Sequence, residues 1–173
     1  MLIVLRSSWA STSHLPPLLK SPHYKITALQ NSSEASARKA VEKYNLAGEV
    51  AGYGDIESLV RDPNVDMVVV SVKTPEHYRL TKPALEAKKD VFVEWPLGAN
   101  LKQAEELTAL AKSQNVRNVI GLQGRQNPSV LKAKELVAEG KLGDIVGTTV
   151  GPIVSGAMAA TNMSGMLKLT RCV

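Results

Sequence analysis

The stretch 92–97, Phe-Val-Glu-Trp-Pro-Leu, holds the residues of this chain that are best suited to chemistry. It follows an apolar run and a Lys-Lys-Asp turn at 88–90, so we expect a strand to end here and to present a carboxylate, an indole and a proline. Ligands bind at the carboxyl ends of the strands in open α/β sheets. A buried Glu94 needs a partner. Trp95 offers a flat face for stacking on a ring or for packing against a second domain, and the bond before Pro96 can be cis.

A second polar group, Asn31, Ser32 and Ser33, follows the strand expected at 24–29. If the sheet binds a dinucleotide at its carboxyl edge, an acidic residue in this place would bind the 2′-hydroxyl of the adenosine ribose. Asn31 is neutral, so it can hydrogen-bond a ribose without repelling a 2′-phosphate, which Arg38 on the next helix can contact. Asn31 and Ser33 can equally be helix caps and nothing more. NAD and NADP therefore both stay open as ligands.

The strand expected at 66–72 ends at Val72, and Lys73 and His77 follow it. Lys73 is a cation at the carboxyl end of this strand, where ligands are expected to bind. It can face a phosphate or an acidic substrate, or it can simply be solvated. Pro75 suits the first turn of a helix. His77 is then either a residue of the helix N-terminus or a base, and we name no other catalytic candidate.

Gln123 follows the strand expected at 118–122. Its amide can both donate and accept hydrogen bonds, as recognition of a carboxamide requires. Alternatively, Arg125 and Pro128 in the same stretch only cap the next helix.

The first crossover lacks the glycine-rich loop that brings backbone N–H groups to a pyrophosphate. Residues 6–14, Arg-Ser-Ser-Trp-Ala-Ser-Thr-Ser-His, contain no glycine. Their hydroxyl groups and Arg6 can supply donors and charge, or the stretch is a polar turn that leads into a short helix. Binding of a dinucleotide is therefore a hypothesis to be tested.

Apolar strand-like runs alternate with helical patterns over most of the chain. The predicted strands are 2–5, 24–29, 66–72, 91–93, 118–122 and 145–150. The predicted helices are 33–44, 76–88 with an interruption at Pro83, 100–113 and 128–139, with caps at Ser33, Asn100 and Gly140. This alternation predicts right-handed βαβ units and hence an α/β fold, a Rossmann-like doubly wound parallel sheet.

The predicted organisation is a dinucleotide-binding domain at 1–124, then a linking helix and the first strand of a truncated second domain at 125–150. The tail, 151–173, is rich in small residues and methionine, and we expect it to be poorly ordered or to form a helix near 157–169.

The bulk composition excludes several classes of protein. A net charge of +5 without a dense Lys/Arg run favours a mildly basic surface over a nucleic-acid patch. The single cysteine excludes an internal disulfide and a cysteine-based metal site. No segment reaches the roughly 18 apolar residues of a membrane span, and residues 1–6 are too short for a signal peptide. We expect a cytoplasmic or nuclear protein without a metal.

Several pieces together resemble the N-terminal domain of the glucose–fructose oxidoreductase / inositol dehydrogenase (Gfo/Idh/MocA) family. They are Trp-Ala at 9–10, His-Leu-Pro at 14–16, Ile-Thr-Ala-Leu at 26–29, and the stretches 69–77, 92–97 and 122–125. The resemblance implies that NAD or NADP is the cofactor and that the full-length protein is a homo-oligomer. The residues that we assign to the cofactor are Ser8, Trp9, Asn31, Ser32, Arg38, Val72, Lys73, His77, Glu94, Trp95 and Gln123.

Val-Glu-Trp at 93–95 and Leu-Gln-Gly-Arg at 122–125 are most similar to the fungal galactose-regulon repressor branch of this family. Membership of that branch implies contact with the acidic segment of a transcription activator rather than turnover. Several fungal relatives with this signature are named oxidoreductases, so a sugar or polyol dehydrogenase in the full-length form is the alternative.

Three departures from the family pattern decide the expected activity. Trp95 stands where the family has a lysine, and an indole cannot exchange a proton with a substrate hydroxyl. The glycine-rich loop is absent, and the second domain stops after one strand. We therefore expect a nucleotide-binding domain that is catalytically impaired as this chain. A truncated product or an imperfect gene model would explain both unusual ends.

Overall fold

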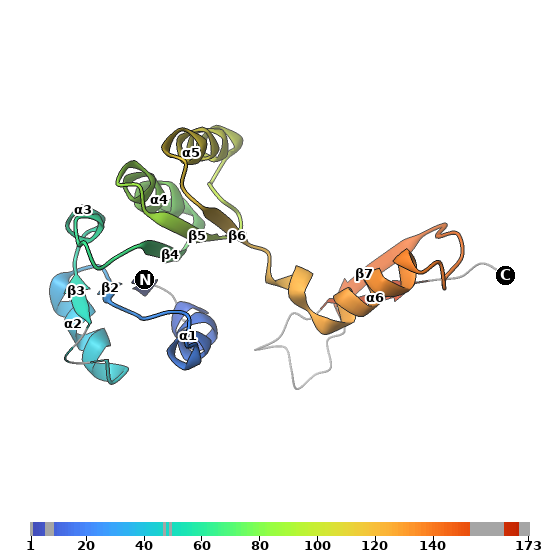
Figure 1. Cartoon of the computed structure of the whole chain (residues 1–173), viewed down its shortest axis with the longest axis horizontal. Coiled ribbons are helices and arrows are strands. Elements are labelled where there is room, and N and C mark those ends of the chain that lie inside the picture. The colour runs from blue at the N-terminus through green and yellow to red at the C-terminus, as the bar shows by residue number, and fades with distance from the viewer. Residues whose placement is uncertain (1, 6–8, 47, 49, 153–164, 170–173) are drawn as a thin grey trace. The chain divides into compact units, whose positions relative to one another are not determined.

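The computed structural model describes residues 2–5, 9–46, 48, 50–152 and 165–169. The chain divides into two compact units, Met1–Gly121 and Leu122–Val173. The first unit contains a six-stranded sheet with helices, and the second contains a two-stranded sheet and one long helix (Figure 1).

All strands of the larger sheet are parallel. They are β1 (Leu2–Leu5), β2 (Ala28–Gln30), β3 (Ala51–Tyr53), β4 (Met67–Ser71), β5 (Asp90–Glu94) and β6 (Asn118–Gly121). Their order is β3-β2-β1-β4-β5-β6, which is the order of a doubly wound dinucleotide-binding sheet. The predicted fold class is therefore confirmed. The carboxyl ends of the strands share one edge, and the strand order reverses between β1 and β4.

Helices cover both faces of this sheet (Figure 1). One face carries the π-helical turn η1 (Ala10–His14), α1 (Leu15–Lys20) and α2 (Glu34–Lys43), and the other carries α3 (Ile56–Val60), α4 (His77–Glu86) and α5 (Leu101–Gln114). The β4 residues alternate between the two cores: Val68 and Val70 pack with α3, α4 and α5, whereas Val69 packs with η1, α1 and α2. A strand that is buried on both faces reads as the continuous apolar run seen in the sequence.

The predicted caps of α2 and α5 are confirmed. Ser33 Oγ accepts a hydrogen bond from the N–H of Ser36, whose own hydroxyl oxygen accepts from the N–H of Ser33. This reciprocal arrangement is a capping box. At α5, Asn100 Oδ1 accepts from the N–H of Gln103 at 3.0 Å, and the residue after the helix, Asn115, caps it with a left-handed φ of 52°.

The predicted interruption at Pro83 is wrong, because α4 is one helix from His77 to Glu86 with the proline inside it. A proline removes one backbone donor and disfavours the preceding turn. Buried side chains on both sides of it, Leu80, Thr81, Ala84 and Leu85, anchor this helix to the core. Tertiary packing therefore overrides the local preference.

The strand β3 and the helix α3 were not predicted from the sequence. Each is short, and none of the three β3 residues is fully buried. A glycine after β3 lets the chain pass close to α2: a Cβ on Gly54 would lie 2.7 Å from the backbone nitrogen of Glu34. Tyr53 donates its hydroxyl to Asp62 at 3.0 Å, and burial together with Asp62 raises the pKa of Tyr53.

The second unit contains η3 (Gln123–Gln126), α6 (Pro128–Ala138), β7 (Thr148–Pro152) and β8 (Gly165–Leu169). Gly140, with φ of 66°, follows the end of α6 as predicted. The expected helix near 157–169 is wrong for 165–169, which pair antiparallel with β7. The second unit thus has two strands where we expected one, because pairing satisfies backbone groups that a lone strand leaves free. The remainder of that expected helix, 157–164, lies outside the described residues.

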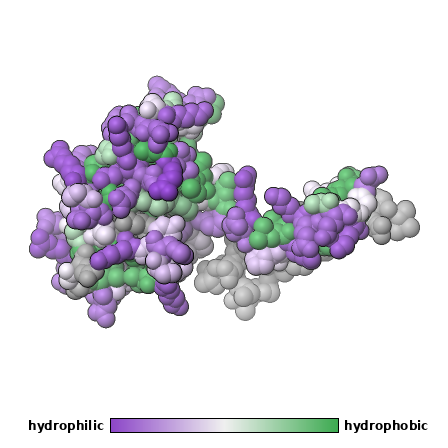
Figure 2. All heavy atoms as spheres, viewed as in Figure 1, coloured by the Kyte–Doolittle hydropathy of each residue, from purple (hydrophilic) through white to green (hydrophobic). Residues whose placement is uncertain are grey.

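In the face of the molecule shown in Figure 2, hydrophilic residues predominate and apolar patches interrupt them. Part of the exposed apolar surface lies on the edge strand β6, where Val119 and Ile120 are exposed. Among the described residues, no helix has both the length and the apolar character needed to cross a membrane.

Candidate functional site

Glu94 ends β5 and pairs with His14 at the end of η1. Nε2 of His14 contacts Oε1 of Glu94, and the two side chains are only 15% and 16% exposed. The ring of Phe92 packs edge-on against His14, with 5.5 Å between the centroids. The expectation that a carboxylate at this strand end needs a partner is confirmed. Sequence reasoning did not assign His14 to the site, although His-Leu-Pro at 14–16 is one of the pieces that carry the family resemblance.

His77 is buried, with an exposed fraction of 1%. Its Nδ1 lies 2.7 Å from the carbonyl oxygen of Pro96, and its Nε2 lies 3.1 Å from that of Val72. A neutral imidazole carries one N–H and donates to one of these carbonyls, whereas an imidazolium donates to both. In either state the ring lies between the end of β4 and the turn after β5, but only the imidazolium hydrogen-bonds both of them. This geometry supports a positioning role rather than the role of a base.

The turn that His77 holds contains the cis bond between Trp95 and Pro96. Trp95 projects outward and is 67% exposed. Lys73, also exposed, precedes the short helix η2 (Thr74–Glu76) at the end of β4. Because Val70 of β4 pairs with Val93 of β5, Lys73 and Trp95 stand at neighbouring strand ends. An indole face and an ammonium group thus occupy one part of the edge.

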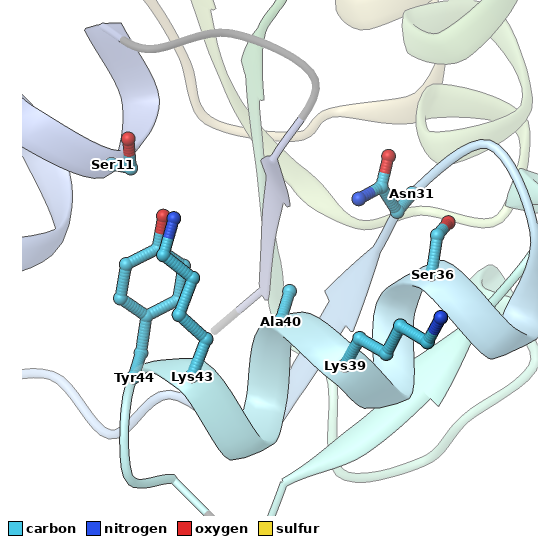
Figure 3. A pocket seen from close by; sticks show the side chains of 7 residues that line it. All are labelled: Ser11, Asn31, Ser36, Lys39, Ala40, Lys43 and Tyr44. Carbon is cyan, nitrogen blue, oxygen red and sulfur yellow. The ribbon is translucent and has the colours of Figure 1, made fainter.

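A pocket of about 240 Å³ lies at the carboxyl end of β2. Its lining comes from η1, from the end of β2 and from α2: Ser11, Asn31, Ser36, Lys39, Ala40, Lys43 and Tyr44 (Figure 3). Asn31 is held in place, because its N–H donates to the carbonyl of Tyr53 at 3.0 Å and its Oδ1 accepts from the N–H of Ser32 at 2.8 Å. Asn31 and Lys39 lie toward one end of the pocket, and Ser11 lies toward the other.

Arg38, the predicted phosphate contact, stands outside this lining. It forms an i,i+4 ion pair with Glu34 on the exposed surface of α2. Lys39 and Lys43 line the pocket instead. These lysines are absent from the predicted site residues, although their i,i+4 spacing beside Ala40 places them on one helix face. Ser32 is exposed, and its hydroxyl lies 3.3 Å from that of Ser36.

The remaining predicted residues are distributed differently. Ser8 lies outside the described residues, and Trp9 is the half-exposed residue that precedes η1. Gln123 begins η3 in the second unit and is exposed. Two groups are brought together at the sheet edge: Asn31 with Ser32 at β2, and Val72, Lys73, His77, Glu94 and Trp95 at β4 and β5.

Residues 7–122 match the family model described as the oxidoreductase family with an NAD-binding Rossmann fold. Dehydrogenase aclE of Aspergillus oryzae is 44% identical over 140 residues, which cover 79% of this chain and 38% of that protein. The galactose/lactose metabolism regulatory protein GAL80 of Kluyveromyces lactis is 37% identical over 146 residues, which cover 80% of this chain and 32% of that protein.

Among solved structures, a super-repressor mutant of Gal80p from Saccharomyces cerevisiae superposes with a TM-score of 0.79 at 30% identity, covering 87% of this chain and 41% of that one. The chain therefore spans roughly a third to two fifths of the length of these relatives.

The side chains at the β2 end fit a dinucleotide. The pocket offers hydroxyl, amide and ammonium groups, and none of the described residues that line it carries a carboxylate. Such groups suit a sugar and a phosphate. Taken with the strand order and the match over residues 7–122, this places the chain in the Gfo/Idh/MocA oxidoreductase family, with an NAD-binding Rossmann domain.

Proposed function

We propose that this chain binds a nicotinamide dinucleotide along the carboxyl edge of its six-stranded sheet and does not by itself catalyse hydride transfer. The observation that carries the proposal is the gathering of ligand-binding groups at that edge. A pocket whose lining includes hydroxyl, amide and ammonium groups lies at β2, and an exposed indole stands at β5. Edges of this kind are where open α/β sheets bind their ligands.

Each group at the edge has a distinct part in binding. Asn31 is placed to hydrogen-bond a ribose hydroxyl, Lys73 supplies positive charge, and the exposed face of Trp95 stacks on a flat ring. When bound, the nicotinamide ring supplies the hydride chemistry of the family. Trp95 stands where the family has a lysine. Its indole N–H donates a hydrogen bond but does not exchange a proton, so this position cannot supply the proton transfer that a lysine would supply.

Two buried contacts hold this edge in shape. The ring of His77 lies within hydrogen-bonding distance of the carbonyls of Val72 and Pro96, and His14 contacts Glu94 directly before Trp95. Groups that bind a ligand work best when packing and hydrogen bonds lock their supports. These contacts therefore stabilise the turn that contains Trp95.

Isothermal titration calorimetry with NAD⁺, NADP⁺, NADH and NADPH tests this function. We expect one site per chain. Trp95→Ala should weaken binding about 5- to 20-fold through lost stacking, while the melting temperature stays unchanged because Trp95 is 67% exposed. Trp95→Phe, which keeps an aromatic face, is the matched control and should bind almost normally. An absence of heat with all four dinucleotides would refute the proposal.

A second candidate is a regulatory role in the full-length protein. It is supported by the similarity to GAL80 of Kluyveromyces lactis and of Saccharomyces cerevisiae, whose names describe regulators of galactose metabolism. The net charge of +5 favours an acidic protein segment as partner. A fluorescent acidic activation-segment peptide should then bind the full-length protein, and more tightly with the dinucleotide present. Turnover of a sugar or polyol without peptide binding would instead favour the dehydrogenase activity suggested by the name of aclE.

A further inference from the structure

The pocket at the end of β2 has an unbalanced charge. Lys39 and Lys43 both line it, and the other described lining residues are neutral. The carboxylate of Glu34 on the same helix is engaged by Arg38. Residues spaced i,i+4 on a helix are neighbours, and like charges at that spacing repel. The pocket therefore favours an anion.

The two lysines are not equivalent. Lys43 has its ammonium group 5.4 Å from the centre of the Tyr44 ring, a cation–π contact. In Figure 3, the side chain of Lys39 extends toward the end of the pocket that holds Ser36 and Asn31. This end also lies beside the first turn of α2, where backbone N–H groups add positive potential. Of the two lysines that line the pocket, Lys39 is thus the one on the side of Asn31, at the end of β2.

The position of Asn31 gives the anion an identity. An acidic residue at the end of the second strand of this fold binds the ribose 2′-hydroxyl and excludes a phosphate there. Asn31 carries no charge, and Ser32 and Ser36 add hydroxyl groups beside it. The Ser36 hydroxyl donates to the Ser33 carbonyl in the capping box. Lys39 is therefore the principal donor for an anion at this end of the pocket.

From this arrangement we infer that the pocket binds the 2′-phosphate of NADP, that Lys39 distinguishes NADP from NAD, and that the chain prefers NADP. The inference rests on the proposed dinucleotide function and specifies its ligand. An ammonium group that donates to a phosphate forms a charge-assisted hydrogen bond, which is stronger than a neutral one. The ribose hydroxyl of NAD offers no such negative charge.

Calorimetric titration of the chain with NADP⁺ and NAD⁺ at low and high salt tests the inference. We expect NADP⁺ to bind about tenfold more tightly than NAD⁺ or better, with the difference shrinking as salt screens the exposed ammonium group. Lys39→Gln should remove most of this preference by weakening NADP⁺ alone. As a smaller probe, 2′,5′-ADP should bind more tightly than 5′-AMP, and Lys39→Gln should abolish that difference.

Arg38→Gln is the matched control, because Arg38 is the adjacent cation, lies outside the pocket and is paired with Glu34. It should leave the preference intact. Equal binding of NADP⁺ and NAD⁺, or a loss of preference in Arg38→Gln but not in Lys39→Gln, would overturn the inference and leave the dinucleotide function standing. Failure of every dinucleotide to bind would overturn both. Circular dichroism verifies that both variants stay folded, which their exposed positions on α2 lead us to expect.

Discussion

Replacing His77 with leucine should lower the free energy of unfolding by about 1–3 kcal/mol. The leucine fills a similar volume but leaves a partly buried carbonyl of Val72 or Pro96 without its ring donor. Because the same ring anchors the turn that carries Trp95, affinity for the dinucleotide should fall in the same variant. Urea denaturation followed by circular dichroism measures the first effect, and calorimetry measures the second.

The exposed His23 provides the control, since His23→Leu removes a histidine from a surface turn and should change neither quantity. The outcome separates two roles for His77. A base that serves only chemistry could be replaced without loss of stability. Wild-type stability and wild-type dinucleotide affinity in His77→Leu would therefore contradict the positioning role that its contacts indicate.

A double-mutant cycle on His14 and Glu94 should give a coupling of about 1–3 kcal/mol. Glu94→Leu leaves the largely buried imidazole without its acceptor, and His14→Leu leaves a largely buried carboxylate without its partner. Each single variant should therefore be markedly less stable than the wild type. The double variant should be more stable than the sum of the two losses predicts, because replacing both partners by apolar groups leaves neither the imidazole nor the carboxylate of this pair without the other.

The same cycle on Glu34 and Arg38 supplies the comparison. That pair is also an ion pair, but its side chains are 59% and 71% exposed. Solvent-exposed pairs of this kind contribute only about 0–1 kcal/mol. If the losses in free energy of unfolding at His14 and Glu94 are additive, or if their coupling is no larger than that of the surface pair, the contact does not stabilise the sheet edge.

Much of the secondary structure could be predicted from the sequence, because strands and helix caps depend on residues that are neighbours along the chain. The run of valines at 68–70 predicts a strand buried on both faces, and Ser33 and Asn100 predict helix starts, as observed. Glu94 at a strand end predicts a partner. The short edge strand β3 carries too few apolar residues to be recognised in this way.

The roles of individual side chains were harder to predict from the sequence. Arg38 and Lys39 are adjacent in sequence, yet one step along a helix turns a side chain by about 100°. One residue therefore faces solvent and Glu34, while the other faces the pocket. Composition at this position predicts a nearby cation but not which one. The packing of α2 against the sheet makes that choice.

By itself the sequence determined the strand–helix alternation, the parallel sheet and the polar residues at the strand ends, because these follow from side-chain period and local backbone hydrogen bonds. Only the tertiary structure decided that His14 meets Glu94 across 80 residues of chain, that His77 is buried between two carbonyls and that Lys39 lines the β2 pocket. Those contacts join elements that are distant in sequence. They depend on how strands and helices stack in space, which no local pattern specifies.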